Sequence, residues 1–243
     1  MCILILVGQL QLTIGNVWAQ QDTVLRDSSA VAVNLSVSLV SSYVWRGQLF
    51  DTHPQLQPEL TIGLGSLEAG LWVSKSIGDI YTELDLFASV EIGKVKLEVY
   101  DYFYIEQKTM QLSDYWRYQN TSTTDATHTF DAIFTLSDPG IDGLSITASC
   151  FFAGYDHDEN RKRLYSNYIG LEYAGSFNET EFLIALGGTL SEGFYATRPA
   201  FTQLAFTAIK SMEIYPQRSI SVSGTLMVNP DSGGVYFIFG FSI

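Results

Sequence analysis

Cysteine and positive charge are both scarce in this chain of 243 residues, which has 2 cysteines and 13 lysines and arginines against 26 aspartates and glutamates. The formal net charge of −13 argues against a nucleic-acid partner, because a phosphate backbone binds a basic surface. Cys2 falls in a segment predicted to be removed, which leaves Cys150 without a partner for an intramolecular disulfide. Cys150 stands on the apolar face of a predicted strand, where we expect it to pack as a small hydrophobic residue.

Long apolar runs are also missing after residue 20. A membrane-spanning helix needs about 20 consecutive apolar residues, and the rest of the chain has no such run. With 47% hydrophobic residues, 14% aromatic residues and 20 glycines, the chain is too apolar for disorder and too rich in glycine and aromatic residues for a helical bundle. If the protein crosses a membrane, we therefore expect it to cross as strands.

Residues 1–19 are predicted to be a signal peptide. An apolar core at Ile3–Leu12 precedes small residues at 17–19, after which a signal peptidase could cut. The signal is unusual because no Lys or Arg stands near its start. The alternative, a first buried strand, is disfavoured by glycines that interrupt the pattern. Residues 20–30 are expected to form a short periplasmic segment ahead of the first strand of the barrel.

Strict alternation of apolar and polar side chains is the strongest pattern in the sequence. In residues 31–39 every second residue is Val or Leu, and the residues between them are Ala, Asn or Ser. The pattern continues to Tyr43 and Trp45, an aromatic pair that we expect at a membrane interface, and the connection 47–56 is expected to follow outside the barrel. Residues 233–243 alternate in the same way, as the closing strand of an outer-membrane barrel does.

About twelve stretches of this kind follow one another, most of about 9 to 11 residues, the length that crosses the hydrocarbon obliquely. Residues 31–243 are therefore predicted to form a single all-β domain, a transmembrane antiparallel up-and-down β-barrel of about twelve strands. The expected strands are 31–46, 57–65, 67–77, 82–92, 95–105, 128–136, 144–155, 165–174, 181–190, 202–210, 219–228 and 234–243.

The connections between these strands alternate in length. With a periplasmic N-terminus, connections such as 93–94, 175–180 and 211–218 fall on the periplasmic side, and longer ones such as 106–127 and 156–164 fall outside. This asymmetry is typical of outer-membrane barrels. A soluble barrel of the lipocalin type would alternate too, but its roughly eight strands need far fewer residues, and charged groups on the polar faces would destabilise a dry core.

One segment also resembles a known family. Ser41–Pro58, SSYVWRGQLFDTHPQLQP, is followed by ELTIGLGSLEAGLWVSKS and then by YTELDLFASVEIGKVKLEVYDYFY. This resembles the TorF-type porin family of Gram-negative bacteria, in which a strand ending in Tyr-Val-Trp-Arg-Gly precedes a Gln-Pro strand, a Trp strand, a Glu-x-Asp strand and a Tyr-rich strand. The resemblance covers residues 41–104 well and the rest only by periodicity. It implies an outer-membrane pore and brings no catalytic residues.

The faces opposite the apolar ones are expected to point into the barrel, and they are mainly acidic. One hypothesis is a water-filled lumen that favours cations and polar solutes. The alternative is that Arg46 and Lys96 pair with neighbouring carboxylates and plug the interior. The candidate lumen-lining residues are Arg46, Glu59, Glu68, Glu83, Asp85, Glu91, Lys96, Glu98, Asp131, Glu172, Glu181, Tyr100, Tyr102 and Tyr104.

The tyrosines at 100, 102 and 104 form a row that could stack solutes, or fill space and hydrogen-bond across the lumen. On the opposite, apolar face of the same strand stands an intruding charge, Asp101.

Catalysis is the alternative from a different functional class. No motif joins a serine to any of the three histidines, His53, His128 and His157, so no catalytic residue is predicted. The series Asp156–Arg163 offers oxygen ligands but lacks the spacing and the glycine of a calcium loop, and it is expected to be a solvated, self-paired hairpin. No cofactor and no metal ion is expected.

The sequence therefore predicts a barrel of the bacterial outer membrane that forms a narrow channel for small polar or cationic solutes. A plugged structural or adhesive barrel is the main alternative, and an outer-membrane lipase or deacylase is a weaker one. The expected partners are outer-membrane lipid and lipopolysaccharide, the barrel-assembly machinery and small solutes.

Overall fold

The computed structural model describes residues 31–79, 81–105, 115–116, 128–215 and 218–243. The predicted signal peptide and the predicted segment 20–30 lie outside these ranges, as does most of the expected connection 106–127. Within the described ranges, no helix combines the length and the apolar character that crossing a membrane requires.

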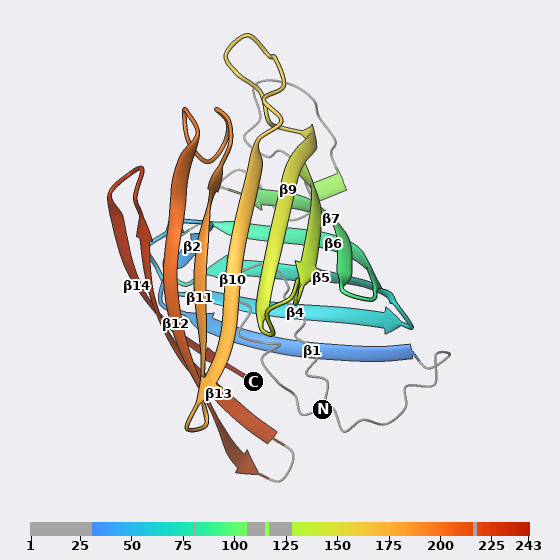
Figure 1. Ribbon diagram of the computed structural model, residues 1–243, viewed down its shortest axis with the longest axis vertical. Helices are drawn as coiled ribbons and strands as arrows, with labels where there is room; N and C mark the ends of the chain where they lie inside the picture. The colour runs from blue at the N-terminus through green and yellow to red at the C-terminus, as the bar shows by residue number, and fades with distance from the viewer. Residues whose placement is uncertain (1–30, 80, 106–114, 117–127, 216–217) are drawn as a thin grey trace.

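Twelve antiparallel strands close into one barrel (Figure 1). They are β1 (Val31–Val40), β4 (Gln55–Leu64), β5 (Leu67–Ser76), β6 (Thr82–Ile92), β7 (Val95–Ile105), β8 (His128–Ser137), β9 (Leu144–Gly154), β10 (Asn167–Phe177), β11 (Thr180–Thr189), β12 (Ala200–Tyr215), β13 (Arg218–Asn229) and β14 (Gly234–Ser242). β1 pairs with both β4 and β14 and so closes the ring. The prediction of an all-β antiparallel barrel of about twelve strands is confirmed.

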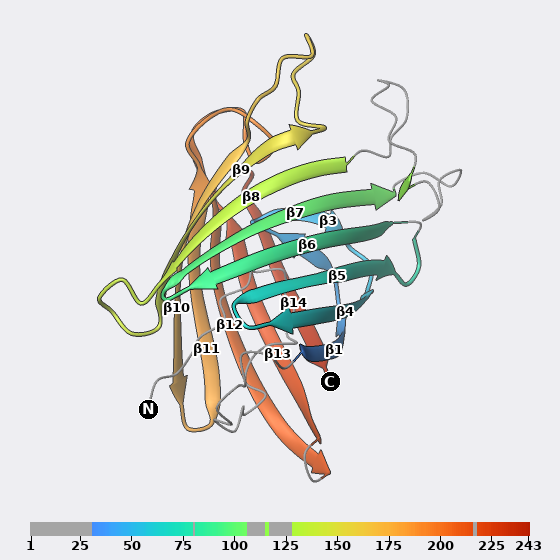
Figure 2. The same cartoon turned by 90° about the vertical axis from the view of Figure 1, so that its right-hand side faces the viewer.

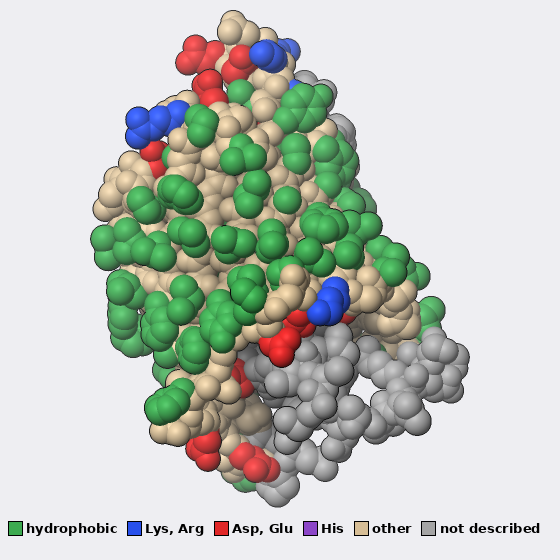
Figure 3. Space-filling model, in the orientation of Figure 1, with side chains coloured by type: hydrophobic (Ala, Val, Ile, Leu, Met, Phe, Trp, Pro, Cys, Tyr) green, Lys and Arg blue, Asp and Glu red, His purple; other side chains and the backbone are tan. Residues whose placement is uncertain are grey.

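Apolar side chains cover the outer face of this ring (Figure 3). On β14, Phe237 and Phe239 are 59% and 53% exposed, whereas Ile238 between them is 1% exposed. Successive side chains of a strand point to opposite faces, so this difference separates an outer apolar face from an inner one. In Figure 3 the charged side chains gather mostly toward the two ends of the barrel.

Two connections differ from their predicted form. Asn178 and Glu179, with φ of 47° and 61°, form a tight turn between β10 and β11, shorter than the predicted connection 175–180. The predicted connection 211–218 is wrong for most of its length, because β12 continues to Tyr215 and pairs there with β13 alone. This two-stranded extension projects beyond the ring at the bottom of Figure 2.

The largest departure from the prediction is at the first strand, which ends at Val40 instead of residue 46. The chain then forms β2 (Tyr43–Trp45) and β3 (Gln48–Asp51), a separate two-stranded sheet that lies inside the ring (Figure 2). Residues 41–54, which contain both strands, are called the lumen hairpin below. The predictions of an interfacial aromatic pair and of an outer connection 47–56 are therefore wrong, since Tyr43 and Trp45 are 3% and 4% exposed inside the barrel.

Local geometry explains the turn of the lumen hairpin. Arg46 and Gly47 have φ of 49° and 82°, the two positive values that a tight two-residue hairpin turn needs. A Cβ on Gly47 would overlap the backbone carbonyl of Thr202, so the closeness of the turn to β12 also requires glycine.

A polar cluster interrupts the apolar outer face on β7 and β8. His128 Nδ1 lies 2.8 Å from Asp101 Oδ1, and the Tyr115 hydroxyl donates to Asp101 Oδ2 at 2.6 Å. His128 Nε2 lies 2.9 Å from the carbonyl oxygen of Tyr115, whose ring packs against Phe103. The described part of the connection between β7 and β8 therefore lies against the outer wall, where it pairs with the aspartate that was predicted to intrude on the apolar face.

Candidate functional site in the barrel lumen

The lumen hairpin crosses the interior from the β1–β4 pair to distant strands. Its base is fixed by the pairing of Val40 with Gln55. At its tip, the carbonyl oxygen of Arg46 accepts from Thr202 Oγ1 of β12 at 3.2 Å, and that of Gly47 accepts from Asn229 Nδ2 of β13 at 3.0 Å. The hairpin is thus hydrogen-bonded at both its base and its tip.

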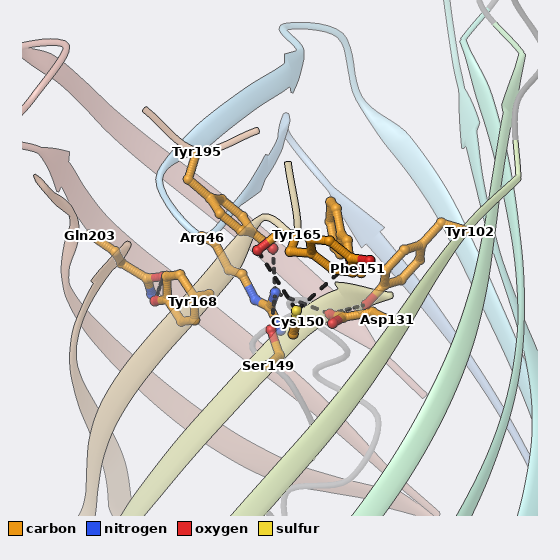
Figure 4. A network of polar contacts seen from close by, with 10 residues as sticks. All are labelled: Arg46, Tyr102, Asp131, Ser149, Cys150, Phe151, Tyr165, Tyr168, Tyr195 and Gln203. Atoms are coloured by element: carbon orange, nitrogen blue, oxygen red, sulfur yellow. Dashed lines mark hydrogen bonds and ion pairs between the residues drawn. The ribbon is translucent and has the colours of Figure 1, made fainter. Parts of the chain in front are cut away.

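Arg46 is the centre of the polar contacts at the tip (Figure 4). Its Nη1 donates to Asp131 Oδ2 of β8 at 3.2 Å, to Ser149 Oγ of β9 at 2.9 Å and to the hydroxyl of Tyr195. Arg46 and Asp131 are 4% and 0% exposed. Charges buried to this degree are tolerated only when they are paired and hydrogen-bonded. The guanidinium and Asp131 Oδ2 meet that condition, whereas Asp131 Oδ1 has no hydrogen-bond partner in the described part of the chain.

Aromatic rings surround the same guanidinium. Its Cζ lies 4.4 Å from the ring centre of Trp45, 4.6 Å from that of Tyr168 and 5.6 Å from that of Tyr195. These distances are within the roughly 6 Å over which a cation is attracted to a ring face. Tyr168 is held in turn by its hydroxyl, which donates to Gln203 Oε1 at 2.7 Å.

Further rings extend this packing across the lumen. The cluster joins the hairpin to β5–β10 and to the connection between β11 and β12, and its buried members are Tyr43, Trp45, Trp72, Tyr81, Phe87, Tyr100, Tyr102, Ile133, Phe151, Tyr168 and Tyr195. Tyr43 lies 5.7 Å from Trp72, and Trp45 lies 5.4 Å from Tyr102, between ring centres. The hairpin therefore packs against the inner wall on several sides and narrows the lumen at its level.

The base of the hairpin carries a buried carboxylate, Asp51. It accepts hydrogen bonds from the backbone N–H of His53 at 2.8 Å and from Gln55 Nε2 at 2.7 Å. Burial acts to raise the pKa of Asp51, but hydrogen bonds from Ser76, His53 and Gln55 outweigh it and hold the pKa below its usual value. Ionised Asp51 thus fixes the turn that leads from β3 to β4.

The inner wall of β4–β7 is acidic. Lys96 Nζ lies 2.8 Å from Glu98 Oε1. In the described part of the chain, Glu59 and Glu68 have no hydrogen-bond or ion-pair partner, although both are electrostatically coupled to this pair. Glu91 stands beside Lys96 in the register of β6 and β7. Carboxylates therefore outnumber cations on this wall.

The predicted lumen-lining residues lie together inside the barrel, but they do not all stand on barrel strands. Arg46 reaches the lumen from the hairpin, whereas the others stand on the inner faces of barrel strands: Glu59, Glu68, Glu83, Asp85, Glu91, Lys96, Glu98, Tyr100, Tyr102, Tyr104, Asp131, Glu172 and Glu181. Whether they line a path for solutes stays a prediction. Of the predicted tyrosine row, Tyr100 and Tyr102 stack at 5.6 Å between ring centres, within the buried cluster.

Sequence reasoning placed Asp131 on the inner face and allowed Arg46 to pair with a carboxylate, but it missed the uncharged groups that contact Arg46. Ser149 and Tyr168 stand on predicted strands, and Tyr195 stands in a predicted connection, so none carries a signal of its own. The signal that was available is the Arg-Gly pair between Trp45 and Gln48, which favours a two-residue hairpin turn over a continuous strand.

The histidines lie in three separate places among the described residues. His53 Nδ1, Asp51 and Asp79 can each offer one ligand atom, and these atoms lie within 4.8 Å of one another. His157 forms a bridge with Arg163 across a loop closed by its own backbone, in which Asp158 N–H donates to the carbonyl of Lys162 at 2.9 Å. That loop has the self-paired form predicted for it.

Comparison with known proteins gives no relative from which a role could be transferred: no protein-family model matches the chain, and no curated protein is similar to it in sequence. The resemblance to TorF-type porins therefore stays a prediction, and the geometry described above carries the functional interpretation.

Proposed function

We propose that this protein is an outer-membrane β-barrel of a Gram-negative bacterium, acting as a narrow channel for small polar or cationic solutes. The observation that supports this most is the difference between the two faces of a closed sheet. Leu35, Phe206 and Leu226 are 71%, 49% and 47% exposed on the outer face, which large apolar side chains on a water-soluble protein seldom are over so wide an area. Hydrocarbon is the solvent that suits such a face, and outer-membrane lipid and lipopolysaccharide would cover it.

Two neighbouring residues of β10 test membrane insertion. Leu171 is 41% exposed on the outer face, whereas Glu172 faces the lumen. Leu171→Arg should reduce the free energy of unfolding from lipid vesicles by about 2–4 kcal/mol, because its charge enters hydrocarbon. Glu172→Arg introduces the same side chain toward the lumen and should cost much less. Equal losses in urea titrations would show that the outer face does not contact lipid.

The acidic inner wall supports a preference for cations. Fixed carboxylates in a narrow, partly desolvated passage raise the local concentration of cations, and salt weakens this effect as the Debye length falls from about 30 Å at 0.01 M to about 3 Å at 1 M. Single-channel recording of refolded protein in planar bilayers should therefore give discrete conductance and a cation-selective reversal potential. Anion preference would contradict the proposed solute class.

A plugged scaffold is the second candidate, and the contacts of Arg46 favour it specifically. A hairpin hydrogen-bonded to β8, β9, β12 and β13 could close the lumen permanently. Replacing residues 43–51 by a flexible Gly-Ser linker separates the two candidates. A channel conducts with the native hairpin and gains conductance in the variant, whereas a plugged scaffold conducts only in the variant.

A further inference from the structure

We propose that the inner wall of β4–β7 holds a binding subsite for a small organic cation, an alkylammonium, formed by Glu59, Glu68 and Glu98 around the rings of Phe87 and Tyr100. This subsite presupposes the channel function proposed above and specifies the class of solute that the acidic lumen retains.

The floor of the subsite is a stacked ring pair. The ring centres of Phe87 and Tyr100 are 5.0 Å apart with an interplanar angle of 18°. A Cβ built on Gly70 would touch the Phe87 ring, so this ring leans from β6 across β5 toward β4. A glycine at that position leaves the room that the ring occupies.

Carboxylates flank this floor on both sides. Gly70 pairs with Thr61 of β4 and with Phe87 of β6. Thr61, Gly70 and Phe87 thus form one row across the three strands. Glu59, two residues before Thr61, stands on one side of this row, and Glu68, two residues before Gly70, stands on the other. Inner-face neighbours offset by two residues lie about 7–8 Å apart, within reach of glutamate side chains. Glu98, which follows Glu68 and Ser89 across the sheet, completes the set.

The subsite already holds one ammonium, from Lys96, and still has an excess of negative charge. Lys96 pairs with Glu98 Oε1, while Glu98 Oε2 has no hydrogen-bond partner in the described part of the structure, although Glu98 is only 3% exposed. Buried polar atoms are normally satisfied, and an ammonium group can donate the hydrogen bond that Glu98 Oε2 lacks.

The mixture of groups selects an organic cation over a metal ion. Calcium takes about 6–8 oxygen ligands that converge on one point, whereas the three carboxylates here are spread around aromatic rings and one oxygen of Glu98 already pairs with Lys96. An ammonium group can pair with a carboxylate while it and its carbon chain lie against a ring face. Butylammonium is a simple probe because it combines one ammonium group with a short carbon chain.

Isothermal titration calorimetry on the refolded barrel in detergent micelles tests the subsite with butylammonium chloride as the probe. Glu59→Gln with Glu68→Gln should weaken binding by about tenfold or more, a loss of about 1.4 kcal/mol. Phe87→Leu should weaken butylammonium binding several-fold and leave the weak response to sodium chloride unchanged. Glu172→Gln is the matched control, because it neutralises an inner-face glutamate on β10, and it should leave the affinity unchanged.

Three outcomes would overturn the subsite: unchanged affinity in the Glu59 and Glu68 variant, an equal loss in Glu172→Gln, or tighter binding of calcium chloride than of butylammonium. If the double variant loses the heat-modifiable mobility of a folded barrel on gels, Glu68→Gln alone replaces it, with weaker binding expected and unchanged affinity contradicting the subsite. Bilayer recordings on the same samples keep the two proposals apart. Cation conductance without butylammonium binding removes the subsite alone, and binding without conductance removes the channel function alone.

Discussion

Charged side chains are paired to different degrees on the two sides of the lumen. On the β8–β10 side, Arg46 and Asp131 are 4% and 0% exposed, and the guanidinium is paired, hydrogen-bonded and covered by rings. On the β4–β7 side, Lys96 is the one cation that pairs in the described wall, and Glu59 and Glu68 lie partly exposed without partners. The β8–β10 side therefore holds the hairpin in place, whereas the β4–β7 side has carboxylates that a cationic solute could bind.

The largest expected effect comes from breaking the ion pair on the β8–β10 side. Arg46→Ala should lower the free energy of unfolding by about 3–5 kcal/mol, because it leaves Asp131 buried without a counter-charge. Lys96→Ala should cost less, since the Lys96 side chain is 12% exposed against 5% for Arg46 and pairs with one residue, whereas Arg46 contacts Asp131, Ser149 and Tyr195. Urea unfolding in lipid vesicles measures both variants.

A double variant serves as the control for that prediction. Arg46→Ala with Asp131→Ala removes both charges and should be more stable than Arg46→Ala alone. Equal stability of the single and double variants would mean that the pair contributes little and that ring packing alone holds the hairpin.

Two glycines separate the backbone cost of a substitution from its packing cost, Gly47 in the lumen hairpin and Gly93 in the turn between β6 and β7. Gly47 and Gly93 both have positive φ, 82° and 63°, so alanine at either position should cost about 1–2 kcal/mol through the backbone alone. At Gly47 the added Cβ also overlaps the carbonyl of Thr202, whereas at Gly93 nothing lies within 4 Å. Gly47→Ala should therefore be the more destabilising in urea titrations and should raise single-channel conductance. Equal costs would show that the hairpin can move away from β12 freely.

Ion selectivity should depend on both acidic groups, but unequally. Glu83 and Asp85 are 5% and 0% exposed, and Glu83 already accepts from the Tyr81 hydroxyl at 2.7 Å. Their replacement by Gln and Asn should reduce cation selectivity less than replacement of Glu59 and Glu68 by Gln, because the latter carboxylates have no hydrogen-bond or ion-pair partner among the described residues to offset their charge. Reversal potentials in a salt gradient give the comparison, and the reverse order would move the selective region toward the hairpin.

The smallest expected effect is the pH dependence of the hairpin base. Because the pKa of Asp51 is lower in the folded state than its unfolded value of about 3.9, its contribution to stability is complete above that value and is lost as the pH falls toward the folded pKa. The native protein should therefore lose more stability than Asp51→Asn between about pH 5 and pH 2.5 in urea midpoints. Parallel curves would show that Asp51 does not anchor the hairpin.

Much of the barrel could be predicted because alternation is a local property. The strands 82–92 and 95–105 have the predicted bounds, and a tight turn at Gly93 sets their pairing. The lumen hairpin could not be predicted in the same way, since Tyr43 and Trp45 alternate as they would on a longer β1. Their location depends on the side chains that they contact inside the closed barrel, namely Trp72 and Tyr102.

The sequence by itself determined most of the barrel strands, their approximate number and the division of their side chains between two faces, because these follow from a period of two and from turn residues. Only the tertiary structure decided which side chains on those faces contact one another. Closure of the ring created an interior in which Arg46 finds Asp131 across a sequence separation of 85 residues. It also set Tyr115 and His128 around Asp101 on the outer wall. Such pairings depend on distances between strands far apart in the sequence, which local patterns do not record.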